Sequence, residues 1–294
     1  MRMLLLGDSV PWGQGLIDSR KYGAIVEQAI PSLRGNRTVA AHSGAIIGSR
    51  SNQLGSAPGE VPISWPTILQ QALAADPADV SIVLMNGGIN DVDIRTILNP
   101  CTDTKDLQDD IEKYCYEDYK ALLLQVRSCF PDAWIVTTGY YSIFSEQSDW
   151  AYMMAALPSL GVGGSFAIPQ HSVVAKLVSL SEQFAQQSNT ALSRAVSDSD
   201  DARSLFVPLG FGPENAMFTE DSFLFGLHPI SMEPVDEVVN QRKQACLTYF
   251  NDPLELFSLF QCMHASAGHP NVQGSARIAE RVLAAIQQNC RFEK

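Results

Sequence analysis

Short apolar runs alternate along this chain with longer amphipathic stretches. The apolar runs that we expect to be strands are Arg2–Leu6, Thr38–Ala41, Val80–Asn86, Trp134–Thr138 and Leu205–Pro208. Helical patterns cover Tyr22–Ile30, Pro66–Ala75, Ile111–Phe130, Val173–Val196 and Val272–Gln288. Parallel strands need long crossover connections, and helices usually supply them. The pattern therefore predicts a three-layer α/β/α sandwich with a central five-stranded parallel sheet and flavodoxin-like winding.

Three long segments interrupt this alternation. They are Asp93–Asp110, Tyr141–His171 and Gly210–Ser266. Each follows a predicted strand, so we expect them to gather at the carboxyl edge of the sheet, where ligands bind in such folds. The sequence has no fixed-period repeat and no charged or low-complexity linker. It therefore predicts one domain over residues 1–294, with insertions near 93–110, 141–171 and 210–266.

The composition excludes several classes of protein. Hydrophobic residues make up 46% of the chain and charged residues 18%, which argues against disorder and coiled coils. Asp and Glu number 32 against 20 Lys and Arg, and the net charge of −12 argues against nucleic-acid or anionic-membrane partners. The charge-free stretch Trp150–Ala175 contains Pro158, Pro169 and three glycines, so it predicts a loop-rich insertion rather than a membrane span.

Six cysteines suggest disulfides. None forms a CxxC pair, and Cys101–Cys115 and Cys246–Cys262 each bracket a predicted excursion, so we expect these two bonds. A third bond, Cys129–Cys290, would join a helix end to the C-terminal region. This reading favours an exported protein whose signal lies outside the given sequence, since the apolar run in MRMLLLGDSV is too short for one. The alternative is a cytoplasmic protein with buried thiols.

The first predicted strand runs directly into a Gly7-Asp8-Ser9 turn. This places Ser9 at the carboxyl end of the strand, where a nucleophile lies in this architecture. An ordinary turn would explain the same three residues, because all are common in turns. A serine nucleophile needs a base, and His269 precedes the last helix in Gly-His-Pro-Asn, within reach of the first strand. His228 has a similar His-Pro pair but no helix behind it.

Two further segments supply hydrogen-bond donors. Asn90 lies in Gly-Gly-Ile-Asn-Asp after the third strand, and its amide can donate to a developing oxyanion. Gly88 permits close approach of the backbone to a substrate. Gly44, in His-Ser-Gly-Ala after the second strand, offers a main-chain N–H as a further donor. Each segment alone is also compatible with a plain turn.

The four segments together resemble the blocks of the SGNH (GDSL-type) hydrolases. GDSV, SGA, GIND and GHPN occur in the same order and context, and the resemblance extends from Met1 to Gln288. It implies an esterase or lipase in which Ser9 is the nucleophile and His269 the general base. The N–H groups of Ser9 and Gly44 and the side chain of Asn90 would then form the oxyanion hole. The resemblance implies no cofactor and no metal.

One position departs from the family pattern. Members commonly have Asp three residues before the histidine, and this chain has Ser266 there. An imidazole without a partner for its second nitrogen loses control of its tautomer. We expect a Ser-His dyad in which the Ser266 carbonyl accepts from the His269 Nδ1–H. A carboxylate from elsewhere, such as Asp221 or Asp236, and the Ser266 hydroxyl or a water remain alternatives.

Rival functions come from three classes. A metal site could be drawn from Cys262, His264 and His269, but the spacing matches no zinc pattern. A mononucleotide site at the first loop would lack a glycine-rich phosphate cradle. The third rival is a catalytically dead binding module of the same fold.

The substrate is expected to be a small-molecule or polysaccharide ester. The aromatic and methionine residues of Trp150–Met154 and Phe218–Phe225 predict either core packing or an acyl-chain groove. Trp12 and Trp65 could instead stack on a sugar, which keeps a carbohydrate O-acetyl esterase as the alternative.

Overall fold

The structure is a computed structural model that describes residues 1–47, 67–160 and 170–291. Five strands form one sheet, and they are β1 (Arg2–Leu6), β2 (Arg37–Val39), β3 (Val80–Met85), β4 (Trp134–Thr138) and β5 (Ser204–Val207). Every neighbouring pair is parallel, and the spatial order is β2-β1-β3-β4-β5. The predicted fold class is confirmed. Three strands are buried along nearly their whole length, as expected of a sheet covered on both faces.

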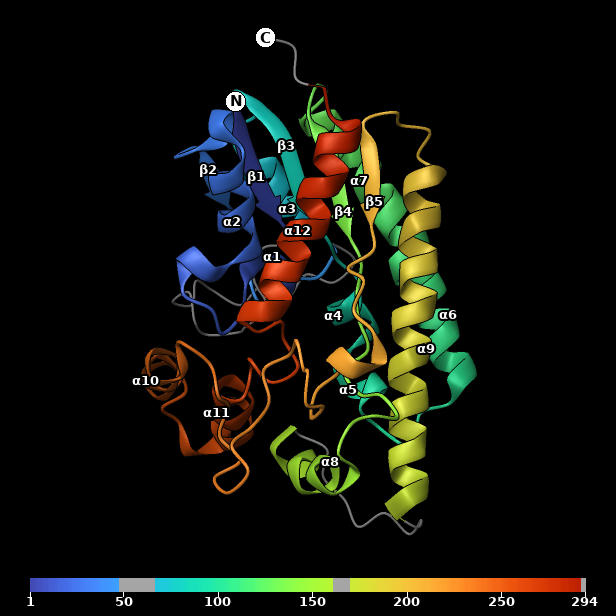
Figure 1. The fold of residues 1–294 in the computed structure, drawn as a ribbon, viewed down its shortest axis with the longest axis vertical. Helices are drawn as coiled ribbons and strands as arrows, with labels where there is room; N and C mark the ends of the chain where they lie inside the picture. Colours follow the sequence, from blue (N-terminus) through green and yellow to red (C-terminus); the bar gives the residue numbers. More distant parts are fainter. Residues whose placement is uncertain (48–66, 161–169, 292–294) are drawn as a thin grey trace.

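Helices cover both faces of the sheet (Figure 1). The longer ones are α2 (Tyr22–Ala29), α3 (Ile68–Ala74), α7 (Tyr119–Cys129), α9 (Gln170–Ser197) and α12 (Val272–Asn289). Figure 1 shows α2 and α12 in front of the sheet and α3 and α7 behind it. The predicted helix over Ile111–Phe130 begins earlier: α6 (Thr104–Ile111) continues through a π-helical stretch, Glu112–Asp118, into α7. Among the described residues no helix is both long and apolar enough to cross a membrane.

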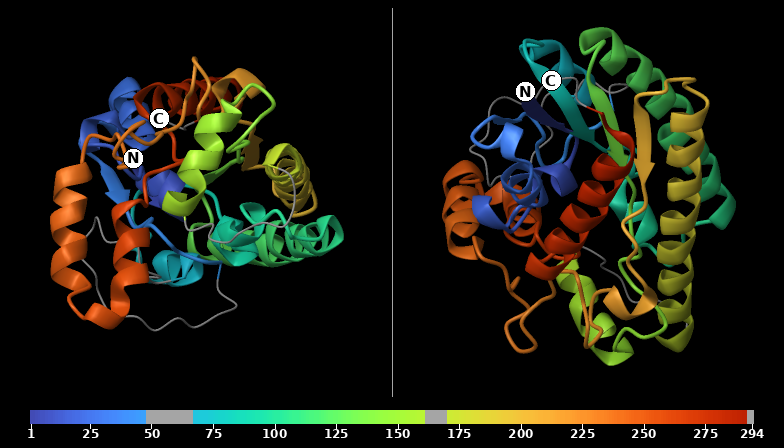
Figure 2. Two further views of the ribbon diagram at one scale, coloured as in Figure 1. Left: turned by 90° about the horizontal axis from the view of Figure 1, so that it is seen from below. Right: turned by 45° about the horizontal axis from the view of Figure 1, so that its top comes forward.

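The described parts of the three predicted insertions lie toward the carboxyl edge of the sheet, at the lower end in Figure 1. The first contains α5 (Ile94–Ile97) and most of α6, after the short α4 (Ile89–Val92). The second contains α8 (Trp150–Ala156) and a 3₁₀ turn, Leu157–Leu160, so its described part is more helical than the sequence suggested. The third contains α10 (Val239–Tyr249) and α11 (Leu256–Met263), which lie side by side in Figure 2.

Two separate apolar clusters are present in the described residues. The larger includes all five strands and the helices on both faces. The smaller lies between α10 and α11, where buried Cys246 and Cys262 are surrounded by partly buried side chains; those are Ala245, Tyr249, Phe250, Leu259 and Met263. A long insertion that packs its own small core is typical of an excursion added to a sandwich fold.

One of the three disulfides expected from the sequence is present. Cys246 and Cys262 form a disulfide, as expected. Cys101 and Cys115 do not: Cys101 is exposed, whereas Cys115 is buried in the π-helical stretch and faces the main core. Cys129 and Cys290 are also free thiols, so the third expected bond is absent from the described residues. Spacing suggested the wrong pair because Cys115 points inward and packs against Gly88.

Candidate active site

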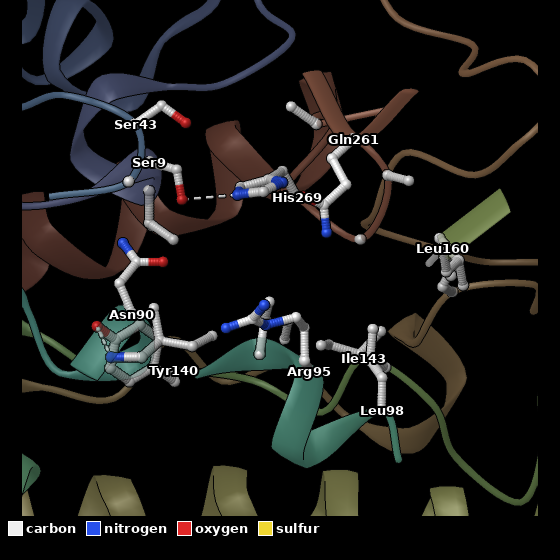
Figure 3. A pocket seen from close by; sticks show the side chains of 18 of the residues that line it. Ser9, Ser43, Asn90, Arg95, Leu98, Tyr140, Ile143, Leu160, Gln261 and His269 are labelled. Carbon is white, nitrogen blue, oxygen red and sulfur yellow. Dashed lines mark hydrogen bonds between the residues drawn. The ribbon is translucent and has the colours of Figure 1, made fainter. Parts of the chain in front are cut away.

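Ser9 and His269 meet at the carboxyl edge of the sheet, although 260 positions separate them. The Ser9 Oγ lies 2.7 Å from the His269 Nε2 (Figure 3). Ser9 opens the short helix α1 (Ser9–Trp12) directly after β1, and only 6% of it is exposed. His269 lies just before α12, as the sequence predicted, and Asn271 caps that helix through its side chain. The pair lines one cavity of about 300 Å³.

A buried carboxylate holds the Ser9 turn. Asp8 caps α1 by accepting from the Val10 N–H at 2.9 Å. The Tyr140 hydroxyl donates to its other oxygen at 2.7 Å and accepts from the Ile89 N–H at 3.2 Å. Burial raises the pKa of Asp8 to about 6, although these hydrogen bonds oppose the rise. Tyr140 thus links the Ser9 turn to the segment that carries Asn90. Sequence reasoning missed Tyr140, although its place directly after β4 was a usable signal.

Three potential donors belong to residues that line the same cavity as the Ser9 hydroxyl. The main-chain N–H groups of Ser9 and Gly44 donate to no other residue in the described parts of the chain. The Asn90 side chain points toward Ser9 in Figure 3 and gives one of its amide hydrogens to the Ala45 carbonyl at 2.9 Å. Gly44 has a φ of +79°, a backbone conformation that favours glycine.

The next residue, Asp91, holds the Gly44 loop in place. Its two carboxylate oxygens accept from the Ile47 N–H at 3.2 and 3.1 Å. Gly88 is equally constrained, because a Cβ there would lie 2.8 Å from the Cys115 Sγ. Asn90 and Asp91 together therefore fix the loop that offers the Gly44 N–H to the cavity.

The imidazole of His269 is partly buried, with its Nδ1 shielded from solvent, and no carboxylate of the described residues is hydrogen-bonded to it. Its Nδ1 makes no hydrogen bond of proper geometry to another described residue. Burial lowers the pKa of His269 to about 4, and the nearby carbonyls of Ala267 and Ser266 oppose this shift. The Ser266 carbonyl also accepts the main-chain N–H of His269 at 2.9 Å. The ring is therefore neutral at neutral pH and free to accept a proton at Nε2.

Asp236 is linked to the loop of His269 through Ser266 and does not bond to the imidazole. Its side chain and that of Arg242 are fully buried and form an ion pair. Arg242 also donates from Nε to the Met263 carbonyl at 3.2 Å, and the Ser266 hydroxyl donates to Asp236 at 2.5 Å. The second acidic candidate, Asp221, is exposed and lies outside the cavity lining. Asp236 thus contacts Ser266, three residues before His269, rather than the imidazole ring.

Main-chain pairing fixes the His269 loop from the other side. The Phe225 N–H donates to the His269 carbonyl at 2.7 Å, and the Gly268 N–H donates to the Phe225 carbonyl at 2.9 Å. These two hydrogen bonds resemble a short antiparallel ladder, and they fix the main chain of the His269 loop against the segment of Phe225.

The cavity walls are mainly apolar. The side chains that line the end away from Ser9 in Figure 3 include Leu98, Ile143 and Leu160. The aromatic segments singled out in the sequence pack elsewhere: Tyr152 stacks on Phe218, and neither lines the cavity. These segments serve packing, except that Met217 and Leu160 beside them reach the cavity.

The other residues that the sequence suggested for sugar stacking, catalysis or metal binding lie outside the cavity or are bonded to other groups. Trp12 packs between Lys21 and His42, away from the cavity, and Trp65 lies outside the described residues. His228 is exposed and accepts from the Ile230 N–H. Cys262 is in the disulfide and is not available as a thiolate for a metal.

Two solved structures resemble this chain over nearly its full length. Phospholipase A1 from Streptomyces albidoflavus NA297 has a TM-score of 0.54 and 13% identity, and the alignment covers 98% of each chain. The extracellular lipase from Streptomyces rimosus has a TM-score of 0.51 and 16% identity, and the alignment covers 98% of this chain and 99% of the lipase. No protein-family model matches, and no curated protein is detectably similar in sequence. The fold is that of the SGNH hydrolases.

Proposed function

We propose that this chain, with its SGNH hydrolase fold, cleaves carboxylic esters through an acyl-enzyme intermediate. The observation that carries the proposal is the 2.7 Å contact between the Ser9 Oγ and the His269 Nε2 inside a cavity with free donors. A hydroxyl is a weak nucleophile, and a neutral imidazole within hydrogen-bond reach is the usual way to activate it. The two structural neighbours are named as a phospholipase and a lipase, which agrees with ester chemistry.

The mechanism follows from the positions of these groups. The Ser9 Oγ attacks the ester carbonyl carbon while its proton passes to the His269 Nε2. The negative oxygen of the tetrahedral intermediate accepts from the Ser9 N–H, the Gly44 N–H and the Asn90 amide. The intermediate collapses as His269 returns the proton to the departing alcohol. Water then attacks the acyl-enzyme by the same route and releases the acid.

Main-chain carbonyls take the place of the usual triad carboxylate in this proposal. The carbonyls of Ala267 and Ser266 raise the pKa of His269 against the effect of burial, although neither accepts a hydrogen bond of proper geometry from Nδ1. We assign Asp236 and its partner Arg242 a positioning role, because they hold the Ser266 side chain three residues before His269. No carboxylate of the described residues contacts the ring.

The substrate is proposed to be an ester with an apolar acyl chain rather than an acetylated sugar. Most of the cavity lining is apolar, and Trp12, which could have stacked on a sugar, lies outside it. A pocket of about 300 Å³ is at the small end of the usual range of ligand sites, so we expect short to medium acyl chains.

Covalent labelling tests the nucleophile. A fluorophosphonate should modify Ser9, and the Ser9→Ala variant should lose both labelling and esterase activity. Ser43→Ala is the matched control, because Ser43 lines the same cavity but lies outside the Ser9–His269 pair. Modification at Ser43 or Ser266, or full activity in Ser9→Ala, would overturn the assignment.

We also propose that the protein works in an oxidising compartment. A disulfide in a helical hairpin persists under oxidising conditions and is rare in reducing cytosol. Thiol titration in denaturant without reductant should find the four free cysteines that the structure describes. Six titratable thiols in protein isolated from its source would contradict the proposal.

A further inference from the structure

Arg95 is a permanent positive charge in the cavity wall. It belongs to α5, five positions after Asn90, and its guanidinium points into the cavity in Figure 3. The other described side chains of the lining are neutral at pH 7, because the pKa of His269 is lowered to about 4 by burial. Arg95, which is paired with Asp93, thus brings a positive charge to the lining in a chain whose net charge is −12.

Asp93 holds this guanidinium by one edge. The Arg95 Nε lies 2.9 Å from each Asp93 carboxylate oxygen, and Nη2 donates to Oδ2. A guanidinium has five N–H donors in a planar fork, and this pairing uses the Nε side. Nη1 donates to no other described residue, so the Nη1–Nη2 edge remains for a ligand. Such an edge matches two oxygens of a phosphate or carboxylate.

The backbone at Asp93 is shaped for this arrangement. Asp93 has a φ of +73°, a conformation that costs free energy for a residue other than glycine. Its carboxylate also accepts from the Arg95 N–H at 2.9 Å and so caps α5. The side chain of Arg95 is 68% exposed, so solvent-screened attraction to Asp93 alone contributes little. The same carboxylate caps α5 and pairs with the guanidinium, so it fixes the orientation of Arg95.

We propose that Arg95 binds an anionic oxygen group on the substrate, which makes the preferred substrate an acyl ester whose alcohol carries a phosphoryl or carboxylate group. The acyl chain occupies the apolar end near Leu98, Ile143 and Leu160, where a charge would be desolvated at high cost. The anion therefore belongs on the alcohol, near the ester bond and the exposed guanidinium. This inference rests on the proposed ester hydrolysis at Ser9.

Three soluble hexanoyl esters test the proposal: those of glycerol, glycerol 3-phosphate and glyceric acid. They present the same acyl chain with a neutral alcohol, a phosphate and a carboxylate. We expect a higher kcat/KM on one or both anionic esters than on the neutral ester. Arg95→Ala should lower the ratio of anionic to neutral kcat/KM about tenfold, mainly through KM, since charge-assisted hydrogen bonds are lost. Arg95→Lys should retain part of the ratio, and added salt should reduce it.

The phosphate and carboxylate arms show which anion the edge prefers. Arg277→Ala is the matched control, because Arg277 is a surface arginine paired with Glu280 outside the cavity lining, and it should leave the ratio unchanged. An equal loss on all three esters in Arg95→Ala, or an unchanged ratio, would overturn the anion subsite. Absence of Ser9-dependent hydrolysis on all three would instead count against the proposed function, so the two failures are distinguishable.

Discussion

The two halves of the Ser9–His269 pair are held by different kinds of structure. Ser9 follows β1 within the main core, and its helix is capped by a buried side chain, that of Asp8. His269 lies behind the third insertion, beside a helical hairpin with its own small cluster. Ser9, the proposed nucleophile, is thus placed by the packing that makes the sheet. His269, the proposed base, is placed by the hairpin and by pairing of its loop with Phe225.

This difference has consequences for stability. Displacing Ser9 requires disrupting strand and core contacts, which is the cost of unfolding the sheet. On the side of the hairpin, His269 is held by a unit that has a small apolar cluster, one disulfide and one buried ion pair, and we expect local opening of this unit to displace the imidazole. Peripheral units of this kind open at lower free energy than the core does. We therefore expect perturbations of the hairpin to remove activity before they unfold the sheet.

The largest effect should come from breaking the buried ion pair. Arg242→Met leaves the Asp236 carboxylate buried without its counter-charge, which destabilises by about 3–5 kcal/mol. It also removes the bond from Arg242 to the Met263 carbonyl on the hairpin. We expect a loss of unfolding free energy in urea and a fall in kcat. An unchanged midpoint with normal kcat would contradict the role assigned to the pair.

A double variant separates stability from positioning. Replacing both charges by apolar residues, as in Arg242→Met with Asp236→Leu, is often neutral for stability. The Ser266 hydroxyl would still lose its acceptor at Asp236, so kcat should remain low although the midpoint recovers. Arg203→Met, which removes an exposed arginine paired with Asp132, is the control for a lost surface charge. Recovery of both quantities together would mean that the pair only stabilises.

The next effect should come from the disulfide. It closes a loop of sequence separation 16, and loops of this length contribute about 3 kcal/mol. The Cys246→Ser/Cys262→Ser variant should lose activity at a lower temperature than the one at which the far-UV signal of the sheet and helices is lost. In the parent protein these two transitions should lie closer together. Cys101→Ser, which removes an exposed free thiol, should leave both transitions in place. Simultaneous loss of both signals in the disulfide variant would contradict local opening.

The same contrast explains which parts of the fold and the site could be predicted from the sequence. The strands and the segment around Ser9 follow local rules, namely buried apolar runs and turn residues at their carboxyl ends, so they were predictable. Asn90 and Gly44 lie where the third and second strands indicated. The sequence offered Asp236 only as an alternative direct partner of His269. Its contacts with Ser266 and Arg242 were not predictable, because they depend on how a 57-residue excursion, numbered 210–266, folds back on His269. The false Cys101–Cys115 pair failed similarly, since spacing does not tell which face of a helix a thiol occupies.

The smallest effect concerns pH, and the two regions contribute with opposite signs. Asp8 has its pKa raised by burial to about 6 from 3.8, so the folded state binds more protons than the unfolded state between these values. Stability from Asp8 therefore falls as pH rises from about 4 to 6. His269 has its pKa lowered by burial to about 4 from 6.5, so its contribution rises with pH across nearly the same interval. Each contribution amounts to about 3 kcal/mol at most.

In the parent protein these two contributions nearly cancel between pH 4 and 6. Removing one group should expose the other: Asp8→Asn should gain unfolding free energy relative to the parent as pH rises, and His269→Ala should lose it. Asn retains one oxygen for the Val10 N–H or the Tyr140 hydroxyl, so any further cost is a pH-independent offset. Urea unfolding of the three proteins at pH 4, 5, 6 and 7 measures the slopes, and groups that titrate elsewhere are common to all three. Parallel curves would mean that neither group titrates differently in the folded and unfolded states. Slopes of opposite sign would show that the turn around Ser9 and the loop around His269 offset each other in acid.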